Sequence, residues 1–330
     1  MTKMRAAITA VGGYVPEDVI TNKDLEKMVE TNDEWITTRT GIKERRIAAE
    51  SQATSDLAIE AAKKAIAMAG IDADDIDCII VASITPDYIF PATACLVQEA
   101  LGCSHAGTFD IEAACSGFIY GLSIANGYVT SGMYDTVLVI AAETLSRITD
   151  WEDRQTCVLF GDAAGAAIVR VTEESSLSKL LSFTLGGSGQ YKDLLMLPAG
   201  GSRNPASAET VQNREHYMKM TGNKVFPVAI KNMSNSARRA LEKAGKHSDD
   251  VKLFIPHQAN MRIIQGVAKQ LDITEDRVMV NIDRYGNTSA ATIPVALSEA
   301  VEQSRIQRGD LVILVAFGGG FTWAASAFNW

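Results

Sequence analysis

Short apolar runs alternate along the chain with longer stretches in which apolar residues recur every three or four positions. Four of the runs are Cys78–Val81, Val137–Ile140, Leu253–Ile255 and Val312–Val315. Continuous runs of this length are typical of strands that are buried on both faces of a parallel sheet. Two of them follow the same features, namely an amphipathic helix, an Ala-Gly stop and an Asp-Asp turn. The pattern predicts an α/β fold built from βαβ units.

These features recur at a fixed distance of 175 positions. The helix segment Ala62–Ile66 matches Ala237–Leu241 at this distance, and the stop, turn and strand that follow each segment match as well. A repeat of about half the chain indicates a duplication and not a solenoid. We therefore expect two related halves, residues 1–174 and residues 175–330, each carrying its own parallel strands.

Three fragments that follow strand-like runs carry polar residues suited to carbon-carbon bond chemistry. They are Cys115 in AACSGF, His257 in IPHQAN and Asn287 in YGNTSA. An offset of 172 positions superposes Cys115 on Asn287, each at the start of a helix of small residues. If the halves are related by a pseudo-twofold axis, these helix starts face each other. Because open α/β sheets place their sites at the carboxyl ends of strands, all three side chains are expected to meet.

Composition places the chain among globular enzymes and narrows its partners. Of its 330 residues 47% are hydrophobic and 22% are charged, and the net charge is -9. This acidic balance argues against nucleic acid as a partner, and an acidic protein would have to dock on a local basic patch. Five cysteines without Cys-x-x-Cys spacing favour a reducing compartment and give no sign of a metal site. The opening Met1–Arg5 does not lead into a signal peptide's apolar core, and no apolar stretch is long enough for a membrane span, so we expect a cytoplasmic protein.

Cys115 is the strongest candidate for a nucleophile. A thiol reacts as its thiolate, and a helix N-terminus is expected to lower its pKa because unpaired N–H groups favour negative charge there. The neighbours Ala113, Ala114, Ser116 and Gly117 are small and leave room for a substrate. Most cysteines are simply buried in a core, and that interpretation is kept for the other four cysteines, Cys78, Cys95, Cys103 and Cys157.

His257 and Asn287 are the candidate hydrogen-bond donors. An isolated histidine is more often structural than catalytic, but His257 ends a buried strand and is better placed than the other three histidines, His105, His216 and His247. Asn287 alone would be an N-cap of the following helix, and it can cap and still direct its amide into a site.

Two further motifs are weaker signals. Gly318–Gly320 follows an apolar strand and can present backbone N–H groups to a developing oxyanion, although a tight turn explains it equally well. Trp35 and Arg39 lie four residues apart on a possible helix and could stack a purine and bind phosphate, or they could simply pack together. No Gly-x-Gly-x-x-Gly follows the first strand, so a dinucleotide site is unsupported.

With these residues in place, the chain resembles the β-ketoacyl-acyl carrier protein synthase III family, the condensing enzymes that start bacterial type II fatty acid synthesis. The resemblance runs through nearly the whole chain. The motifs that carry it, in order, are Thr31–Ile36, Arg39–Ile42, Ala113–Phe118, Phe160–Ala166, Pro256–Asn260, Gly286–Ala290 and Gly318–Trp323. It implies a thiolase-like fold of two duplicated halves in five layers, αβαβα, and a homodimer.

The resemblance also implies roles for residues at the reacting centre. Cys115 would be the acylated nucleophile, and His257 and Asn287 would bind the thioester carbonyl of the malonyl group. Backbone N–H groups of Cys115 and Gly319 would form the oxyanion hole. Phe90 would cross the dimer interface to close the acyl pocket.

Other implied roles concern coenzyme A and the carrier protein. Trp35 and Arg154 would enclose the adenine, Arg39 would bind the phosphates, and Asn223 and Asn260 would line the pantetheine arm. Arg262 would be the charge at the centre of the carrier-protein docking region. One departure puts part of that region in doubt, because many members have a lysine where this chain has Pro227. Lys224 or Lys231 could substitute for it.

The implied reaction joins an acyl-coenzyme A, with acetyl as the expected primer, to malonyl-acyl carrier protein with loss of carbon dioxide. It needs no metal or redox cofactor, since coenzyme A enters as part of the substrate. Elongating synthases use two histidines, but this chain has no histidine after His257. Thiolases need a second cysteine near the C-terminus, but the last cysteine here is Cys157. Plant-type polyketide synthases share the Cys, His and Asn set and remain the alternative enzyme. A catalytically silent binding protein of the same fold is the alternative outside enzymes.

Overall fold

The computed structural model describes residues 5–330, so Met1–Met4 of the opening segment considered above lie outside it. The first of two large sheets has the order β1-β7-β6-β4-β5. β4 runs parallel to its neighbours β5 and β6, whereas β7 is antiparallel to both β6 and β1. The strands are β1 (Arg5–Tyr14), β4 (Cys78–Ala82), β5 (Gly107–Ile111), β6 (Thr136–Thr144) and β7 (Asp162–Thr172).

The second large sheet repeats this arrangement with the order β11-β12-β13-β8. The strands are β8 (Lys179–Gly187), β11 (Leu253–Pro256), β12 (Leu311–Gly318) and β13 (Thr322–Asn329). The parallel pair β11–β12 sets Leu253 beside Val312, and in the first sheet β4–β6 sets Cys78 beside Val137. Both partners move by the offset of 175 read from the sequence. The division into halves at residue 174 remains our interpretation of this layout.

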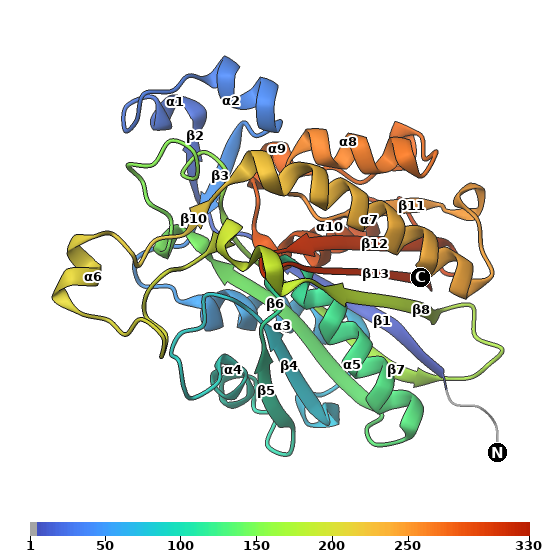
Figure 1. Cartoon of the computed structure of the whole chain (residues 1–330). Helices are drawn as coiled ribbons and strands as arrows, with labels where there is room; N and C mark the ends of the chain where they lie inside the picture. Colours follow the sequence, from blue (N-terminus) through green and yellow to red (C-terminus); the bar gives the residue numbers. More distant parts are fainter. Residues whose placement is uncertain (1–4) are drawn as a thin grey trace.

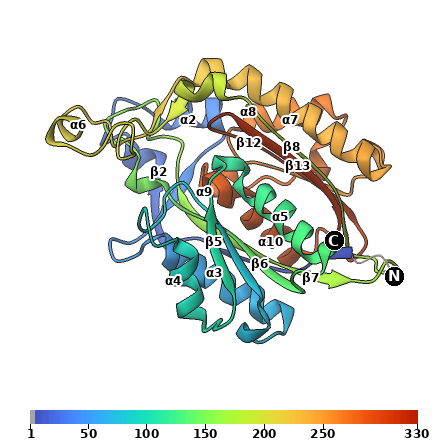
Figure 2. The same cartoon turned by 60° about the horizontal axis from the view of Figure 1, so that its bottom comes forward.

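Helices cover and separate the sheets (Figures 1 and 2). α3 (Thr54–Ala69) and α4 (Thr93–Leu101) pack on the outer face of the first sheet. α7 (Gly222–Ala244) and α8 (Met261–Gln270) lie outside the second. α5 (Gly117–Ser131) and α10 (Thr292–Glu302) fill the space between the sheets. The result is the predicted five-layer αβαβα architecture.

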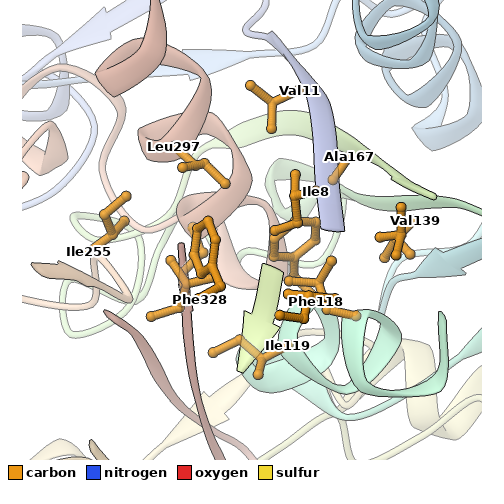
Figure 3. Close-up of a cluster of buried hydrophobic side chains, with 14 of the residues drawn as sticks. Ile8, Val11, Phe118, Ile119, Val139, Ala167, Ile255, Leu297 and Phe328 are labelled. Atoms are coloured by element: carbon orange, nitrogen blue, oxygen red, sulfur yellow. The ribbon is translucent and has the colours of Figure 1, made fainter. Parts of the chain in front are cut away.

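A hydrophobic cluster occupies each interface between layers. The central cluster is shown in Figure 3, where Phe118 and Ile119 of α5 lie close to Phe328 of β13, and Leu297 extends from α10. All four side chains are fully buried. The two helices that follow the candidate residues are therefore anchored by buried apolar packing between the sheets.

The helices of the repeat end as the sequence predicts. α3 and α7 stop at Gly70 and Gly245, whose φ angles of 63° and 65° place both in the left-handed region. A glycine is favoured there because it has no Cβ to clash with the preceding carbonyl. Each stop is followed by a short 3-10 turn, η1 (Ala73–Asp75) or η5 (Ser248–Asp250).

Smaller elements surround the carboxyl ends of the parallel strands (Figure 1). One group is α1 (Asn22–Leu25), α2 (Asp33–Thr40), β2 (Asp18–Thr21), β3 (Glu44–Ile47) and α9 (Ile282–Tyr285). A projecting lobe contains η4 (Gly189–Leu194), β9 (Leu195–Met196), α6 (Ala208–Gln212) and β10 (Lys219–Met220). None of the helices within residues 5–330 combines the length and apolar character of a membrane span.

Candidate active site

Cys115 lies in η2 (Ala114–Ser116), a 3-10 turn between β5 and the start of α5. Ala114 has a φ of 44°, a conformation that residues other than glycine rarely adopt. β12 approaches this turn so closely that a Cβ on Gly318 would lie 2.6 Å from the Cys115 nitrogen. Thr322 Oγ1, at the start of β13, holds the residue before this turn by donating to the Ala113 carbonyl at 2.7 Å. The nucleophile is therefore positioned by the strands of the opposite half.

His257 follows β11 and is 1% exposed. Its Nδ1 lies 2.7 Å from Thr292 Oγ1 at the start of α10. Among residues 5–330 the other ring nitrogen, Nε2, has no hydrogen-bond partner, and the residue lines the cavity described below. The ring is thus held through one nitrogen and presents the other to a substrate.

Asn287 precedes η7 (Ser289–Ala291), the 3-10 turn that leads into α10. Its Oδ1 accepts the Ser289 N–H at 2.9 Å, and its own N–H binds the Leu159 carbonyl at 2.8 Å. Within the described part of the chain, no acceptor is bound to the side-chain Nδ2. Asn287 therefore caps the turn through oxygen and retains an unused amide donor.

The turns η2 and η7 are structural equivalents, and their offset in the sequence differs from the predicted one. Ser289 opens η7 with a φ of 50°, as Ala114 opens η2 with 44°. They are separated by 175 positions, so the counterpart of Cys115 is Ala290 and the predicted superposition of Cys115 on Asn287 at 172 is wrong. The expectation that both helix starts meet is correct, since η2 and η7 contact each other.

One cavity of 1340 Å³ collects the candidate residues. Its buried lining includes Cys115, His257 and Asn287, and its half-buried and exposed lining includes Trp35 and Arg262. Arg39, Asn223, Asn260 and Gly319 also line it. The cavity is larger than a typical drug-sized pocket and can hold an elongated ligand from the surface to the thiol.

Burial controls the ionisation of the inner residues. It raises the pKa of Cys115 to about 12, an effect that outweighs the lowering by the Ser289 hydroxyl and the backbone N–H. The predicted lowering of this pKa by the helix start is therefore wrong, because desolvation of the thiolate dominates. Burial also lowers the pKa of His257 to about 3, so the imidazole is neutral at physiological pH.

Trp35 is flanked by cations at the cavity mouth. The guanidinium carbons of Arg39 and Arg154 lie 4.6 Å and 4.9 Å from the centre of its ring. Trp35 and Arg154 thus contact each other directly, and their enclosing an adenine stays a prediction. A purine stacked between them would need a wider gap, so Arg154 has to move aside to admit one.

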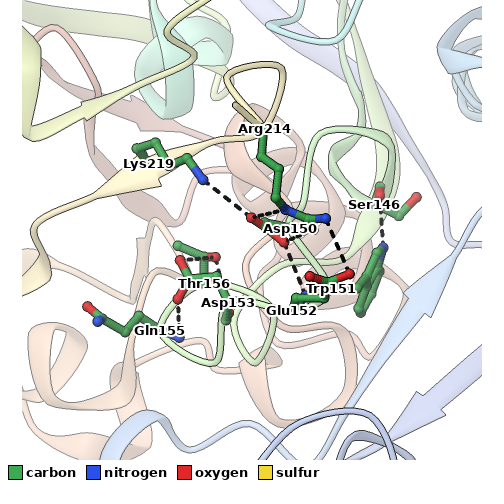
Figure 4. A network of polar contacts seen from close by, with 9 residues as sticks. All are labelled: Ser146, Asp150, Trp151, Glu152, Asp153, Gln155, Thr156, Arg214 and Lys219. Carbon is green, nitrogen blue, oxygen red and sulfur yellow. Dashed lines mark hydrogen bonds and ion pairs between the residues drawn. The ribbon is translucent and has the colours of Figure 1, made fainter. Parts of the chain in front are cut away.

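A buried carboxylate anchors the segment that carries Arg154 (Figure 4). Asp150 pairs with Arg214 and, at 3.3 Å, with Lys219, both from the projecting lobe. The Arg214 hydrogen bond holds the Asp150 pKa down to about 2. Asp153 then accepts the Gln155 N–H at 2.9 Å. Ion pairs of Asp150 therefore connect the projecting lobe to the loop that carries Arg154.

Asn260 and Arg262 occupy the start of α8. Asn260 is its N-cap, accepting the Arg262 N–H at 2.9 Å and donating to the Arg39 carbonyl at 3.0 Å. Each end of its amide makes one hydrogen bond, so the second Nδ2 hydrogen and the second lone pair of Oδ1 remain for the predicted contact with pantetheine. Arg262 is exposed, and its guanidinium lies 3.4 Å from the Thr38 carbonyl.

Pro227 changes the start of α7. It lies inside that helix and has no N–H, so the helical hydrogen bond to the Asn223 carbonyl four residues earlier cannot form. Asn223 itself is exposed and lines the cavity. Lys224 and Lys231 are exposed on the same helix.

The remaining candidates differ in their surroundings. Gly319 lines the cavity beside Gly318, the residue that touches the Cys115 turn. Phe90 is 84% exposed at the tip of a loop with Tyr88 and Ile89, which are 60% and 88% exposed. Tyr88 and Ile89 line the cavity, but Phe90 does not, so a single chain leaves its ring in solvent.

The other cysteines and histidines stay outside the site. Of the five cysteines, all within residues 5–330, Cys115 alone lines the cavity. Burial raises the pKa values of Cys78, Cys103 and Cys157 to about 11. His105 and His247 are exposed, and His216 binds Thr210. No group of three or more potential metal ligands is arranged to hold an ion in the described residues.

Sequence reasoning missed the polar residues behind the thiol. Glu143 of β6 is fully buried, and its Oε2 accepts from Ser83, Ile84 and Thr85 at 2.7–3.2 Å. Ser289 lies in η7, which contacts both η2 with Cys115 and β6 with Glu143. The sequence did contain a signal, because Glu143 is the one charged residue in an apolar strand. A carboxylate buried in this way needs polar partners nearby.

Comparison with known proteins decides the family. Family models described as 3-oxoacyl-[acyl-carrier-protein (ACP)] synthase III and as its C-terminal part match residues 109–189 and 241–330. The chain is 53% identical over 326 residues to the β-ketoacyl-[acyl-carrier-protein] synthase III of Natranaerobius thermophilus, covering 98% of this chain and 99% of that one. It belongs to the β-ketoacyl-acyl carrier protein synthase III family. The predicted family is thereby confirmed.

Two further comparisons agree with this membership. The synthase III of Caldanaerobacter subterraneus is 54% identical, covering 99% of this chain and 98% of that one. The crystal structure of 3-oxoacyl-[acyl-carrier-protein] synthase III from Aquifex aeolicus superposes with a TM-score of 0.90 at 47% identity, covering 98% and 100% of the two chains. The predicted thiolase-like fold and the assignment as an acyltransferase of the synthase III family are confirmed.

The buried imidazole of His257 predicts a specific acid sensitivity. The unfolded chain binds a proton with the ordinary pKa of 6.5, whereas the folded chain does so only near 3, so folding stability falls as pH drops below about 6.5. From pH 7 to pH 5 the wild type should lose about 2 kcal/mol more free energy of unfolding than His257→Gln, which cannot titrate. Urea unfolding of both proteins at the two pH values measures this. Equal losses in the two proteins would contradict a neutral buried imidazole.

Proposed function

We propose that this synthase condenses an acyl-coenzyme A, with acetyl as the primer, with malonyl-acyl carrier protein to give a 3-oxoacyl-carrier protein, coenzyme A and carbon dioxide. The observation that carries the proposal is that Cys115, His257 and Asn287 line the buried part of one cavity. A thiol beside two unused neutral hydrogen-bonding groups suits a Claisen condensation, in which a nucleophile holds the acyl group while donors stabilise an enolate.

The first half-reaction is acyl transfer to the enzyme. Cys115 Sγ attacks the thioester carbonyl, an oxyanion forms, and coenzyme A leaves with the proton that the thiol gave up. Backbone N–H groups of Cys115 and Gly319 are the proposed oxyanion donors. The contact between Gly318 and the Cys115 nitrogen supports this, because it brings the glycine loop to the nucleophile.

The second half-reaction is decarboxylation and carbon-carbon bond formation. Loss of carbon dioxide leaves an enolate whose oxygen is bound by Asn287 Nδ2 and His257 Nε2. Donation from Nε2 requires a proton there. The Thr292 hydroxyl lies 2.7 Å from Nδ1 and 3.0 Å from the Ser289 carbonyl, and in the proposed mechanism its one proton points to Nδ1, which keeps the ring proton on Nε2. The enolate carbon then attacks the acyl group and releases the Cys115 thiolate. Neither half-reaction needs a metal or redox cofactor.

The mouth of the cavity supports a coenzyme A thioester as the first substrate. Trp35 offers a stacking surface for adenine once Arg154 moves aside, and Arg39 offers positive charge for phosphate. Asn223 and Asn260 line the cavity wall along the path to Cys115. These assignments support acyl-coenzyme A as substrate and do not depend on the length of the acyl chain.

The exposed loop at Phe90 supports a homodimer. Three consecutive large apolar residues, Tyr88, Ile89 and Phe90, are 60%, 88% and 84% exposed in a single chain. A second copy that covers this loop would remove the apolar surface from water. In the proposed dimer Phe90 closes the partner's acyl pocket. We also propose that the enzyme works in the cytoplasm.

Cys115→Ala tests the nucleophile. Acetyl-coenzyme A should add one acetyl group to the wild type and none to the variant, because Cys115 is the cysteine that lines the cavity. Intact mass followed by peptide mapping measures this. A label on Cys103 or Cys157 would move the nucleophile elsewhere. An unlabelled wild type would instead favour a silent binding protein.

His257→Ala and Asn287→Ala test the enolate donors. Both variants should still be acylated on Cys115, since the donors act after that step. Condensation of the acyl-enzyme with malonyl-carrier protein should fall on the order of a hundredfold or more, the scale for loss of one oxyanion donor. Single-turnover release of carbon dioxide separates the steps. Normal turnover by either variant contradicts the assignment.

Arg262→Glu tests carrier-protein docking. The net charge of -9 repels an acidic partner, so docking should depend on a local positive charge beside the cavity. The Michaelis constant for malonyl-carrier protein should rise and acylation by acetyl-coenzyme A should change little. Lys63→Glu on α3 makes the same charge change on the opposite outer layer and serves as the control. If both variants behave alike, the docking surface lies elsewhere.

A further inference from the structure

Two polar atoms behind the nucleophile lack regular hydrogen bonds. In the described part of the chain, Glu143 Oε1 and Ser289 Oγ are both buried and have no partner of normal geometry. All three donors to Glu143, from Ser83, Ile84 and Thr85, go to its Oε2. A buried carboxylate oxygen left open in this way is costly unless it has a task.

The layout of the chain places these atoms on elements that adjoin the turn of the thiol. η7, which carries Ser289, contacts both η2 with Cys115 and β6 with Glu143. The Ser289 hydroxyl lowers the pKa values of both Cys115 and Glu143, although it makes no regular hydrogen bond. Cys115, Ser289 and Ser83 also line the cavity. The Ser289 hydroxyl can therefore receive a proton on one side and give one on the other.

We propose that Glu143, through the Ser289 hydroxyl, accepts the proton of the Cys115 thiol during acylation. This inference rests on the function proposed above. As the Sγ–carbon bond forms, the thiol proton passes to Ser289 Oγ while the Ser289 proton passes to Glu143 Oε1. When the thioester breaks, the proton returns by the same route to the departing coenzyme A sulfur. Glu143 is again a carboxylate, and no oxidant or further reactant is consumed.

The ionisation of neighbouring groups favours Glu143 over His257 as the acceptor. Burial raises the pKa of Glu143 to about 7, so the carboxylate forms near neutral pH and holds a proton well. Burial lowers the pKa of His257 to about 3, so this ring holds a second proton poorly. The thiol itself needs an acceptor, because burial raises its pKa to about 12.

Other charged groups on the elements around β6 are engaged elsewhere. Asp162 of β7 accepts from Ala48 and Ser146, and Arg170 of β7 lies opposite Thr136 at the far end of β6. The helix α3 also packs against β6. Its charged residues are exposed or half-buried, and they are Asp56, Glu60, Lys63 and Lys64. Cys115 is therefore the titratable neighbour that Glu143 meets through Ser289.

The test measures acylation alone as a function of pH. Rapid mixing with acetyl-coenzyme A and intact mass should show a wild-type rate that rises with pH through about 7. Glu143→Gln keeps the shape and the acceptor for Thr85, and Ser289→Ala removes the link. Both should slow acylation about a hundredfold and lose the rise with pH. Ser116→Ala removes a buried, unpartnered hydroxyl next to Cys115 and should leave the rate unchanged.

A second measurement separates a proton acceptor from a structural residue. Variants acylated by long incubation should condense with malonyl-carrier protein at close to the wild-type rate, since the relay serves the first half-reaction. Acylation of Glu143→Gln at the wild-type rate with the wild-type pH profile overturns the proposal. Should that variant not fold, Ser289→Ala decides in the same way. A wild type that is not acylated on Cys115 defeats the proposed function itself, which is a different result.

Discussion

The close approach of two helix starts between the sheets is the constraint on which the site depends. A Cβ on Gly117, at the start of α5, would lie 2.9 Å from the Ala82 Cβ and 3.5 Å from the Ala290 Cβ. Gly318 leaves equally little space beside Cys115. Because these positions carry no side chain, η2, η7 and the end of β12 can converge. Any larger residue would push the nucleophile away from the donors that the other half supplies.

Convergence in a dry interior sets the electrostatics of the site. Cys115, Glu143 and His257 are all buried, and desolvation is the largest cause of the pKa shift in each. Desolvation favours neutral forms, which suits a histidine that donates without being charged but opposes a thiolate. The same burial that keeps His257 neutral therefore creates the need for a proton acceptor behind Cys115.

Much of the frame could be predicted from the sequence because its signals are local. Apolar runs identified β4, β6, β11 and β12, and the Ala-Gly stops located the ends of α3 and α7. Cys115 and His257 were found because each follows a strand, whereas the run before Asn287, which was expected to be strand-like, ends in the short helix α9. Glu143 and Thr292 were not found, since their partners lie far away in the chain: Ser83 is 60 residues from Glu143, and His257 is 35 from Thr292. The offset between the two turns was wrong because the helix starts were aligned by their residue types. The backbone conformation instead aligns Ala114 with Ser289.

The paired left-handed residues Ala114 and Ser289 bear on how such a protein arose. A duplicated chain inherits two copies of the same turn, and each copy is equally able to present a side chain to the shared interior. Here one copy presents a thiol and the other, at Ala290, a methyl group. Because the second turn carries no nucleophile, its neighbours do not have to serve one. Ser289 and Thr292 can therefore serve the residues around the first turn. The two turns thus share a backbone conformation, while their different side chains have different functions.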